Sequence, residues 1–142
     1  RGKEFVTRKV SDGVARIKLG LAKKITLGNL EAKRDWGFAG DFVEAMHMMV
    51  QQKEPGDYVV CTAVQHSIRE LLTTAFRTAE IDDWEQYVES DPRYKRPAEV
   101  FALHGSYAKA KEKLGWEPKT EFKDMISFMV KEDIRRLSRD IR

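Results

Sequence analysis

The feature of this sequence that most constrains its fold is the scarcity of segments that could form buried strands. "KITLG" (24–28) is short, contains β-branched residues and breaks at Gly28-Asn29. "YVVC" (58–61) is a continuous apolar run between turns, which is typical of a strand covered on both faces. "DWEQYVE" (83–89) alternates only weakly, and "VFAL" (100–103) is shorter still. Because helical patterns separate these segments, we predict an α/β chain with an incomplete sheet.

The helical patterns are longer and more regular than the strand patterns. Two of them predict a buried face from spacing alone. The first such face comprises Val10, Val14, Ile17 and Leu21, and the second, in a helix from about Gly40, comprises Phe42, Met46, Met49 and Val50.

Three further helices have recognisable ends. Ser67-Ile68-Arg69-Glu70 is a capping box, in which a serine hydroxyl and a glutamate carboxylate satisfy exposed amide groups reciprocally. A short helix is expected over residues 106–115, with Ser106 as its cap and Gly115 at its end. The last helix is expected to begin near Thr120.

The composition bears on possible partners and on cellular location. The net charge of +3 is a small excess of 26 basic over 23 acidic residues, so no nucleic-acid partner is required. Cys61 is the sole cysteine, so an intrachain disulfide is impossible and a reducing, cytoplasmic location is expected. No apolar run approaches the length of a membrane span, so we expect no membrane partner. The first residue is Arg1 rather than methionine, from which we expect an excerpt of a longer protein.

Basic residues occur at three places where elements begin or end. These are Arg8 with Lys9, Arg34 after a glycine turn, and Arg93 with Arg96 in "DPRYKRPAEV". Ligands of open α/β sheets bind at such positions, and the planar guanidinium fork matches phosphate oxygens two at a time. We therefore predict that separated arginines converge on one diphosphate, the alternative being that they are solvated surface charges.

The segments around these arginines resemble a known family. "FVTRKV", "TLGNLEAKRDWGFAGDFVEAM" and "DPRYKRPAEVFALHGSYAKAKEKLGWEP" resemble the C-terminal half of extended short-chain dehydrogenases/reductases that act on nucleotide sugars. Within that group the chain is similar to the GDP-mannose 4,6-dehydratases. The resemblance implies that residues 1–142 are the substrate-binding portion of a Rossmann-like enzyme, whose dinucleotide-binding domain lies upstream of this chain. It also implies GDP-mannose as the substrate, NADP as the cofactor, and a homo-oligomer, a dimer or tetramer.

The resemblance also implies roles for matching residues. Arg34 of "RDW" would contact the nucleotide diphosphate, Arg96 would lie near phosphate, and Glu99 near ribose or base. Arg1 would contact NADP. The remaining nucleotide-binding positions implied are Lys9, Val10, Ile25, Thr26 and Leu27. One departure from the family pattern is Ala63, which stands where these dehydratases usually have glycine.

The family's catalytic residues, including a tyrosine and a lysine four residues apart, match nothing in this chain. The same spacing at Tyr107 and Lys111 lies in a lysine-rich helix, and we interpret it as a solvated helix face. The nine glycines contain no G-x-G-x-x-G loop. The three histidines have no ligand partners at metal-binding spacing, so we expect no metal. The chain alone is expected to be inactive.

Two other functions remain open at this point. One is an epimerase or dehydratase for another nucleotide sugar, because residues that would discriminate lie upstream. The other is a basic interaction module without catalysis. Against the module, the charges along the helices alternate in sign and form no single-sign face.

Overall fold

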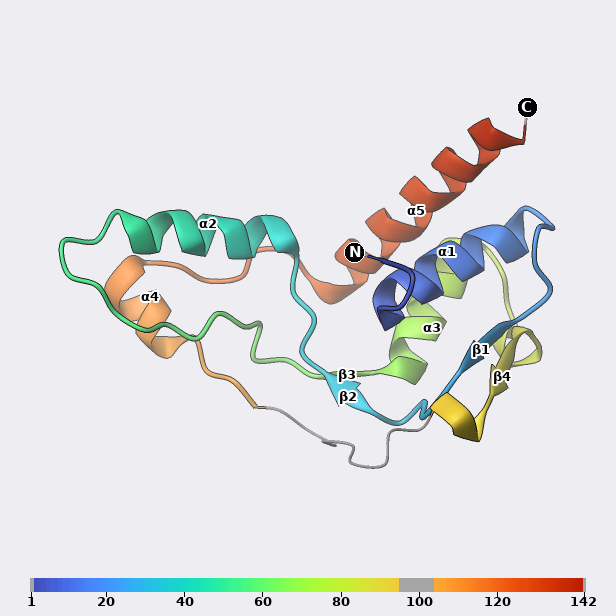
Figure 1. Ribbon diagram of the computed structural model, residues 1–142, viewed down its shortest axis with the longest axis horizontal. Coiled ribbons are helices and arrows are strands. Elements are labelled where there is room, and N and C mark those ends of the chain that lie inside the picture. The colour runs from blue at the N-terminus through green and yellow to red at the C-terminus, as the bar shows by residue number, and fades with distance from the viewer. Residues whose placement is uncertain (1, 95–103, 142) are drawn as a thin grey trace. The chain divides into compact units, whose positions relative to one another are not determined.

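The computed structural model describes residues 2–94 and 104–141, which form helices and short strands (Figure 1). The chain divides into two compact units. Unit 1 comprises residues 1–32, 67–99 and 126–142, and unit 2 comprises residues 33–66 and 100–125. The helix α5 (Phe122–Asp140) begins in unit 2 and continues into unit 1.

Unit 1 is built from helices around one small sheet. Besides most of α5, its elements are α1 (Val6–Lys18), β1 (Ile25–Leu27), α3 (Ile68–Thr78), the 3-10 turn η1 (Trp84–Tyr87), β4 (Val88–Ser90) and the 3-10 turn η2 (Pro92–Tyr94).

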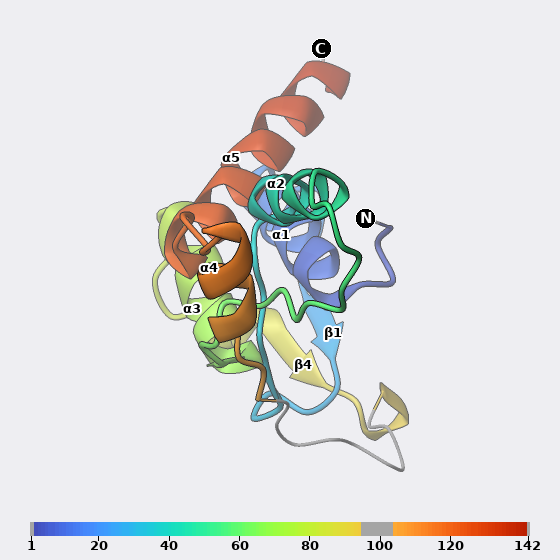
Figure 2. The same ribbon diagram turned by 90° about the vertical axis from the view of Figure 1, so that its left-hand side faces the viewer.

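The sheet of unit 1 pairs strands that are far apart in the sequence. β1 runs parallel to β4, with Thr26 opposite Glu89, and the two lie side by side in both views (Figures 1 and 2). The predicted strand over 24–28 is therefore confirmed. The segment predicted as a strand over 83–89 is partly wrong, because residues 84–87 form a 3-10 turn and pairing starts at Val88.

The core of unit 1 confirms most of the face predicted for the first helix. Val10 and Val14 of α1 have no exposed surface, and α1 packs against α3, where Leu71, Leu72 and Phe76 are equally buried. Leu21, predicted on the same face, is exposed, because α1 ends at Lys18 and Gly20 then takes a left-handed φ of +71°. The pattern was correct within the helix and failed beyond its end.

The capping box of α3 forms as predicted. The Ser67 hydroxyl accepts the Glu70 amide at 3.1 Å, and a Glu70 carboxylate oxygen accepts the Ser67 amide at 2.6 Å. Both donors lie within one helical turn of each other, so local sequence suffices to define this end.

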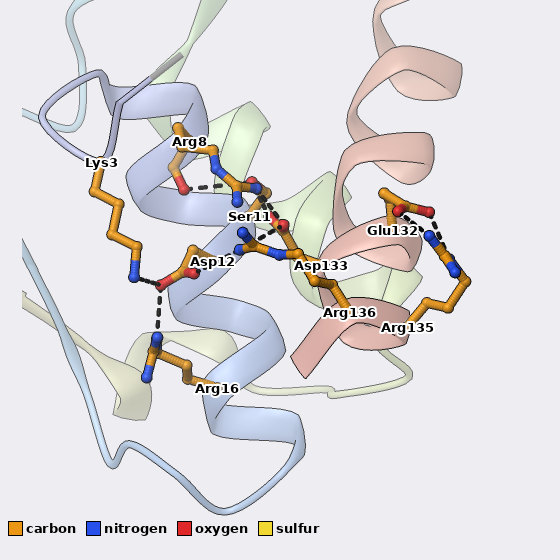
Figure 3. Close-up of polar contacts among 9 residues, drawn as sticks. All are labelled: Lys3, Arg8, Ser11, Asp12, Arg16, Glu132, Asp133, Arg135 and Arg136. Atoms are coloured by element: carbon orange, nitrogen blue, oxygen red, sulfur yellow. Dashed lines mark hydrogen bonds and ion pairs between the residues drawn. The ribbon is translucent and has the colours of Figure 1, made fainter. Parts of the chain in front are cut away.

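A polar network joins α1 to the C-terminal part of α5 inside unit 1 (Figure 3). Asp133 is only 1% exposed; it accepts hydrogen bonds from the Arg8 guanidinium and, at 2.7 Å, from the Ser11 hydroxyl. Asp12, also buried, accepts a hydrogen bond from Arg16 at 2.7 Å. A salt bridge to an internal carboxylate therefore already occupies Arg8, which the sequence offered as part of a basic ligand cluster.

Unit 2 is held by a helix pair and a tryptophan. Its elements are β2 (Lys33–Arg34), α2 (Ala39–Val50), β3 (His66–Ser67, which ends in unit 1) and α4 (Ala108–Leu114), and β2 pairs with β3. Ala45, Ala110 and Trp116 form its buried core. The Trp116 indole donates to the Asp41 carbonyl at 2.8 Å, while the Asp41 carboxylate accepts the amides of Lys119 and Thr120 at 3.0 and 2.8 Å.

Two predictions for unit 2 fail, the first only in part. Of the predicted helical face, Phe42 and Met49 pack against the core, but Met46 and Val50 are 60% and 76% exposed, because α2 turns Asp41 and Ala45 toward the core. Residues 58–61 form no strand: in the described ranges no segment pairs with them, and Val59 is exposed while Cys61 is buried. A continuous apolar run predicts a covered strand only if neighbouring strands are present.

The remaining helix ends agree closely with the sequence. α4 ends at Gly115, which adopts a left-handed φ of +72° as a C-terminal cap should. Its start lies two residues after Ser106, whose hydroxyl accepts the Ala108 amide at 3.3 Å. The predicted strand over 100–103 lies outside the described residues. Within residues 2–94 and 104–141, no helix is both long and apolar enough to cross a membrane.

Candidate functional site

In unit 1, the predicted nucleotide residue Thr26 lines an open hollow of about 460 Å³. The other residues around it come from the end of β4 and from η2: Glu89, Ser90, Asp91, Pro92, Arg93 and Tyr94. Because β1 and β4 pair in parallel, their carboxyl ends lie at one edge of the sheet, which is where ligands of α/β sheets bind.

Lys9 lies beside this hollow. Its Nζ is 4.4 Å from the centre of the Tyr94 ring, a distance typical of a cation–π contact. The structure thus brings together Lys9 and Thr26, which the sequence placed 17 positions apart. Their binding of a nucleotide stays a prediction.

The other three predicted residues of unit 1 have a packing role. These residues are Val10, Ile25 and Leu27. All three are buried, and none of them lines the hollow beside Thr26. They hold α1 and β1 in place, and so determine where Lys9 and Thr26 lie. Direct contact between these three residues and a ligand also stays a prediction.

An ion pair fixes the rim of the hollow. The Arg93 guanidinium donates to the Asp91 carboxylate at 2.7 and 2.9 Å. This hydrogen bonding lowers the pKa of Asp91 and raises that of Arg93. Asp91 also accepts the Arg93 amide at 2.9 Å, which closes the turn.

In unit 2, Arg34 lies at the end of β2 and is half-buried. One of its guanidinium nitrogens donates to the Lys33 carbonyl at 2.6 Å. Arg34 belongs to a different unit from Lys9 and Thr26. Convergence of the separated arginines on one diphosphate stays a prediction. Arg1, Arg96 and Glu99 lie outside the described residues.

The contacts of Asp35 explain why the charged pair Arg34-Asp35 precedes the α2 helix. Its carboxylate accepts the amides of Thr62 and Ala63 at 3.0 and 2.8 Å, and the Thr62 hydroxyl at 2.7 Å. Asp35 thereby fixes the loop that follows residues 58–61 to the segment that carries Arg34. Sequence reasoning missed this role, because the bonded residues are 27 and 28 positions apart.

The fixed loop contains a strained residue. Ala63 has a φ of +61°, a left-handed conformation that glycine adopts at lower cost than alanine. We expect Ala63→Gly to raise the free energy of unfolding by roughly 0.5–1 kcal/mol, measured by urea denaturation. The converse change, Gly20→Ala at a φ of +71° with open space around it, should lower stability by a similar amount. A lower midpoint for Ala63→Gly would show that the loop does not retain this backbone conformation.

Trp36 lines a second cavity, which lies wholly in unit 2 and has a volume of about 360 Å³. Its ring stacks on Phe122 with centroids 5.9 Å apart, and His66 stacks on Phe122 at 3.8 Å. Thr62, Val64 and residues 118–123 complete the lining. Trp36 therefore packs against the ring of Phe122.

The Tyr107–Lys111 pair has no arrangement for catalysis. The ring of Tyr107 packs edge-on against Trp116, with centroids 6.0 Å apart, and Lys111 forms a salt bridge with Glu117. The interpretation as a solvated face is correct for the lysine and wrong for Tyr107, which is half-buried. Among the residues that the structure describes, no cluster of His, Cys, Asp or Glu could hold a metal ion.

The sequence did not single out Tyr94 or Asp91. A signal was present in the Asp-Pro pair at 91–92, which predicts a turn that would place nearby side chains at a strand end. The parallel pairing of β4 with β1, which makes that end part of a hollow, came only from the structure.

Comparison with known proteins agrees with these features. The profile of the family described as GDP-mannose 4,6 dehydratase matches residues 1–129. The chain is 51% identical over 140 residues to GDP-mannose 4,6 dehydratase 2 of Arabidopsis thaliana, and 42% identical over 150 residues to GDP-mannose 4,6 dehydratase of Homo sapiens. The matches cover 99% and 94% of this chain but 37% and 40% of those relatives, so the chain spans well under half their length.

A solved structure shows the same fold. RMD from Pseudomonas aeruginosa, complexed with NADPH, superposes with a TM-score of 0.83 and 25% identity. The match covers 96% of this chain and 44% of that one. The Rossmann-like class predicted from the sequence is thereby confirmed for the matched part. Since the family profile extends over most of the sequence and includes both hollows and Arg34, this chain belongs to the GDP-mannose 4,6 dehydratase family.

Proposed function

We propose that this chain is the nucleotide-sugar-binding part of an NADP-dependent GDP-mannose 4,6-dehydratase. The enzyme would convert GDP-mannose to GDP-4-dehydro-6-deoxymannose with loss of water. The observation that carries this proposal is the 51% identity to a GDP-mannose 4,6 dehydratase over 99% of the chain. The chain spans 37% of that relative, so the reaction is proposed for the complete enzyme and not for these 142 residues alone.

Two positive side chains support the binding of a diphosphate. Arg34 lies at the end of β2, and Lys9 lies beside the hollow at the carboxyl end of β1. An arginine fork can bind two phosphate oxygens at once, whereas lysine acts as a compact charge. In the proposal, Arg34 and Lys9 bind the diphosphate of GDP-mannose and Thr26 supplies a hydroxyl to the nucleotide; Arg96 and Glu99 would complete the site.

NADP would be bound mainly by other parts of the enzyme. The similar RMD structure holds NADPH, and Arg1 is the position proposed here to contact the cofactor. The described residues do not fit a dinucleotide on their own, since no G-x-G-x-x-G loop occurs in the sequence. No catalytic step is therefore assigned to residues of this chain, and we propose that the chain alone is inactive.

The proposal includes assembly of the complete enzyme as a homo-oligomer in the cytoplasm. Against the alternative of a different nucleotide-sugar enzyme, named GDP-mannose dehydratases match at 42–51% identity over nearly the whole chain. Against a basic interaction module, many exposed lysines and arginines form salt bridges with neighbouring carboxylates, for example Lys119 with Glu44 and Arg69 with Glu31.

Binding of GDP tests the proposal. We expect Arg34→Ala to weaken the affinity of the chain for GDP by about 10- to 100-fold, because a charged hydrogen-bond donor to phosphate is lost. Isothermal titration calorimetry of GDP into both proteins measures this. Arg34→Lys should bind with intermediate affinity, since it keeps the charge but loses the fork.

A matched control is Arg135→Ala, which removes an exposed arginine that pairs with Glu132 on α5. It should leave GDP affinity unchanged. Equal affinity of wild type and Arg34→Ala, with unchanged melting temperatures, would refute the phosphate-binding role of Arg34.

A further inference from the structure

Tyr94 is the aromatic side chain among the described residues that line the hollow beside Thr26, and 55% of its surface is exposed. One part of the ring is already in contact with the Lys9 ammonium group, at 4.4 Å from the centroid. The sequence predicted roles for Lys9 and Thr26 but none for Tyr94, which contacts Lys9 and lines the same hollow as Thr26.

We propose that the ring of Tyr94 is the surface on which the purine base of the nucleotide stacks. The inference rests on the proposed function, because it takes GDP as the ligand of this part of the chain. Arg34 and Lys9 are proposed to bind phosphate, and Tyr94 would add recognition of the base.

The backbone holds Tyr94 in one place. The Asp91 amide donates to the Leu27 carbonyl at 2.8 Å, and the Ser90 hydroxyl donates to the Gly28 carbonyl at 3.1 Å. The Tyr94 amide closes the turn on the Asp91 carbonyl at 3.0 Å. The turn η2 is therefore fixed to the end of β1, so the backbone that carries Tyr94 loses little conformational freedom when a base binds.

Gly28 allows this close approach. A Cβ atom at position 28 would lie 2.5 Å from the Tyr94 carbonyl oxygen, which is closer than any real contact. A side chain there would displace the turn that carries Tyr94. The absence of a side chain at Gly28 therefore allows the turn to place Tyr94 in the hollow that Thr26 lines.

The surroundings of the ring suit a nucleobase. Aromatic side chains stack on bases with about 1–3 kcal/mol per base. The hollow of about 460 Å³ has the size of a small-molecule site. Its lining residues Thr26, Ser90, Glu89 and Asp91 carry hydroxyl or carboxylate oxygens, and the two carboxylates also pair with Lys24 and Arg93. These oxygens can accept hydrogen bonds from the N–H groups that a guanine presents. Lys9, against the ring, supplies a positive charge close to where the phosphates would follow.

The same pair of residue types in unit 2 provides a matched control. Lys109 Nζ lies 5.1 Å from the centre of the Tyr58 ring, but Tyr58 packs against the core formed by Ala45, Ala110 and Trp116. A tyrosine–lysine contact therefore occurs in both units. The tyrosine of unit 1, Tyr94, lines the hollow that contains Thr26, whereas the tyrosine of unit 2, Tyr58, packs against a core. Replacement of Tyr58 tests whether any loss of binding is specific to Tyr94.

The experiment measures the affinities of GDP and of inorganic pyrophosphate for the 142-residue chain by calorimetry. Tyr94→Leu is expected to weaken GDP binding about 5- to 100-fold and to leave pyrophosphate binding within twofold of wild type. Tyr94→Phe should bind GDP as wild type does, since it retains the ring. Tyr58→Leu should not change the ratio of the two affinities. Melting temperatures confirm that each variant is folded, and Tyr94 is exposed enough for its replacement to be tolerated.

Three results would overturn the proposal. If Tyr94→Leu binds GDP like wild type, or loses GDP and pyrophosphate equally, Tyr94 does not bind the base. If wild type binds pyrophosphate as tightly as GDP, no base site exists in this chain. If wild type binds neither, the proposed nucleotide function of this chain fails as well, which distinguishes that failure from an error about Tyr94 alone.

Discussion

Replacing Asp133 with alanine is expected to lower the free energy of unfolding by about 3–5 kcal/mol, because it leaves a partly buried arginine without its counter-charge. Asp133 is almost fully buried and accepts hydrogen bonds from Arg8 and from the Ser11 hydroxyl. Arg136 adds a third donor at 3.5 Å. In Asp133→Ala all three donors lose this acceptor, and the Arg8 guanidinium, whose side chain is only 19% exposed, loses its counter-charge. Urea denaturation followed by circular dichroism measures the change.

The adjacent residue provides a control for this prediction. Glu132 lies on the same helix, and its carboxylate pairs with Arg135 at the surface. Exposed ion pairs of this kind contribute less than about 1 kcal/mol, so Glu132→Ala should hardly shift the denaturation midpoint. If the two alanine variants unfold at the same urea concentration, Asp133 does not hold α5 to α1 in solution.

Replacing Trp116 with alanine is expected to destabilise unit 2 by about 3–5 kcal/mol. Trp116 is buried in the core of this unit, where its ring meets Phe42 and Tyr107 edge-on at centroid distances of 6.1 and 6.0 Å. Its indole N–H also donates to the Asp41 carbonyl. Loss of the side chain removes the largest apolar surface in the unit and leaves that carbonyl without its donor.

Amide hydrogen exchange resolves this effect by unit. In Trp116→Ala the amides of α2 should lose protection, while those of α1 in unit 1 should retain more of it. Trp116→Phe keeps most of the packing and loses the hydrogen bond, so we expect a smaller loss, of about 1–2 kcal/mol. A phenylalanine variant as unstable as the alanine variant would mean that the hydrogen bond to Asp41, and not packing, holds α2 in place.

The candidate site could be predicted in part from the sequence. Resemblance to a family supplied Lys9 and Thr26; in the structure Thr26 lines the hollow and Lys9 contacts Tyr94 at its rim. It could not supply Tyr94, whose place depends on the parallel pairing of β1 with β4 and on the close approach that Gly28 permits. Arg8 was misjudged for the same kind of reason, because its partner Asp133 is 125 positions away.

What the sequence by itself determined is local: the capping box at Ser67 and the helix end at Gly115. Each depends on groups within one helical turn, so the residues that decide it are neighbours in the chain. The tertiary structure alone decided that Asp35 binds the loop at Thr62, that Asp133 is the partner of Arg8, and that residues 58–61 form no strand. A hydrogen bond or salt bridge is made to whichever group the fold brings within about 3 Å, and a strand forms only beside another strand. Spacing along the sequence predicts neither which group will lie within bonding distance nor which segments will lie side by side as strands.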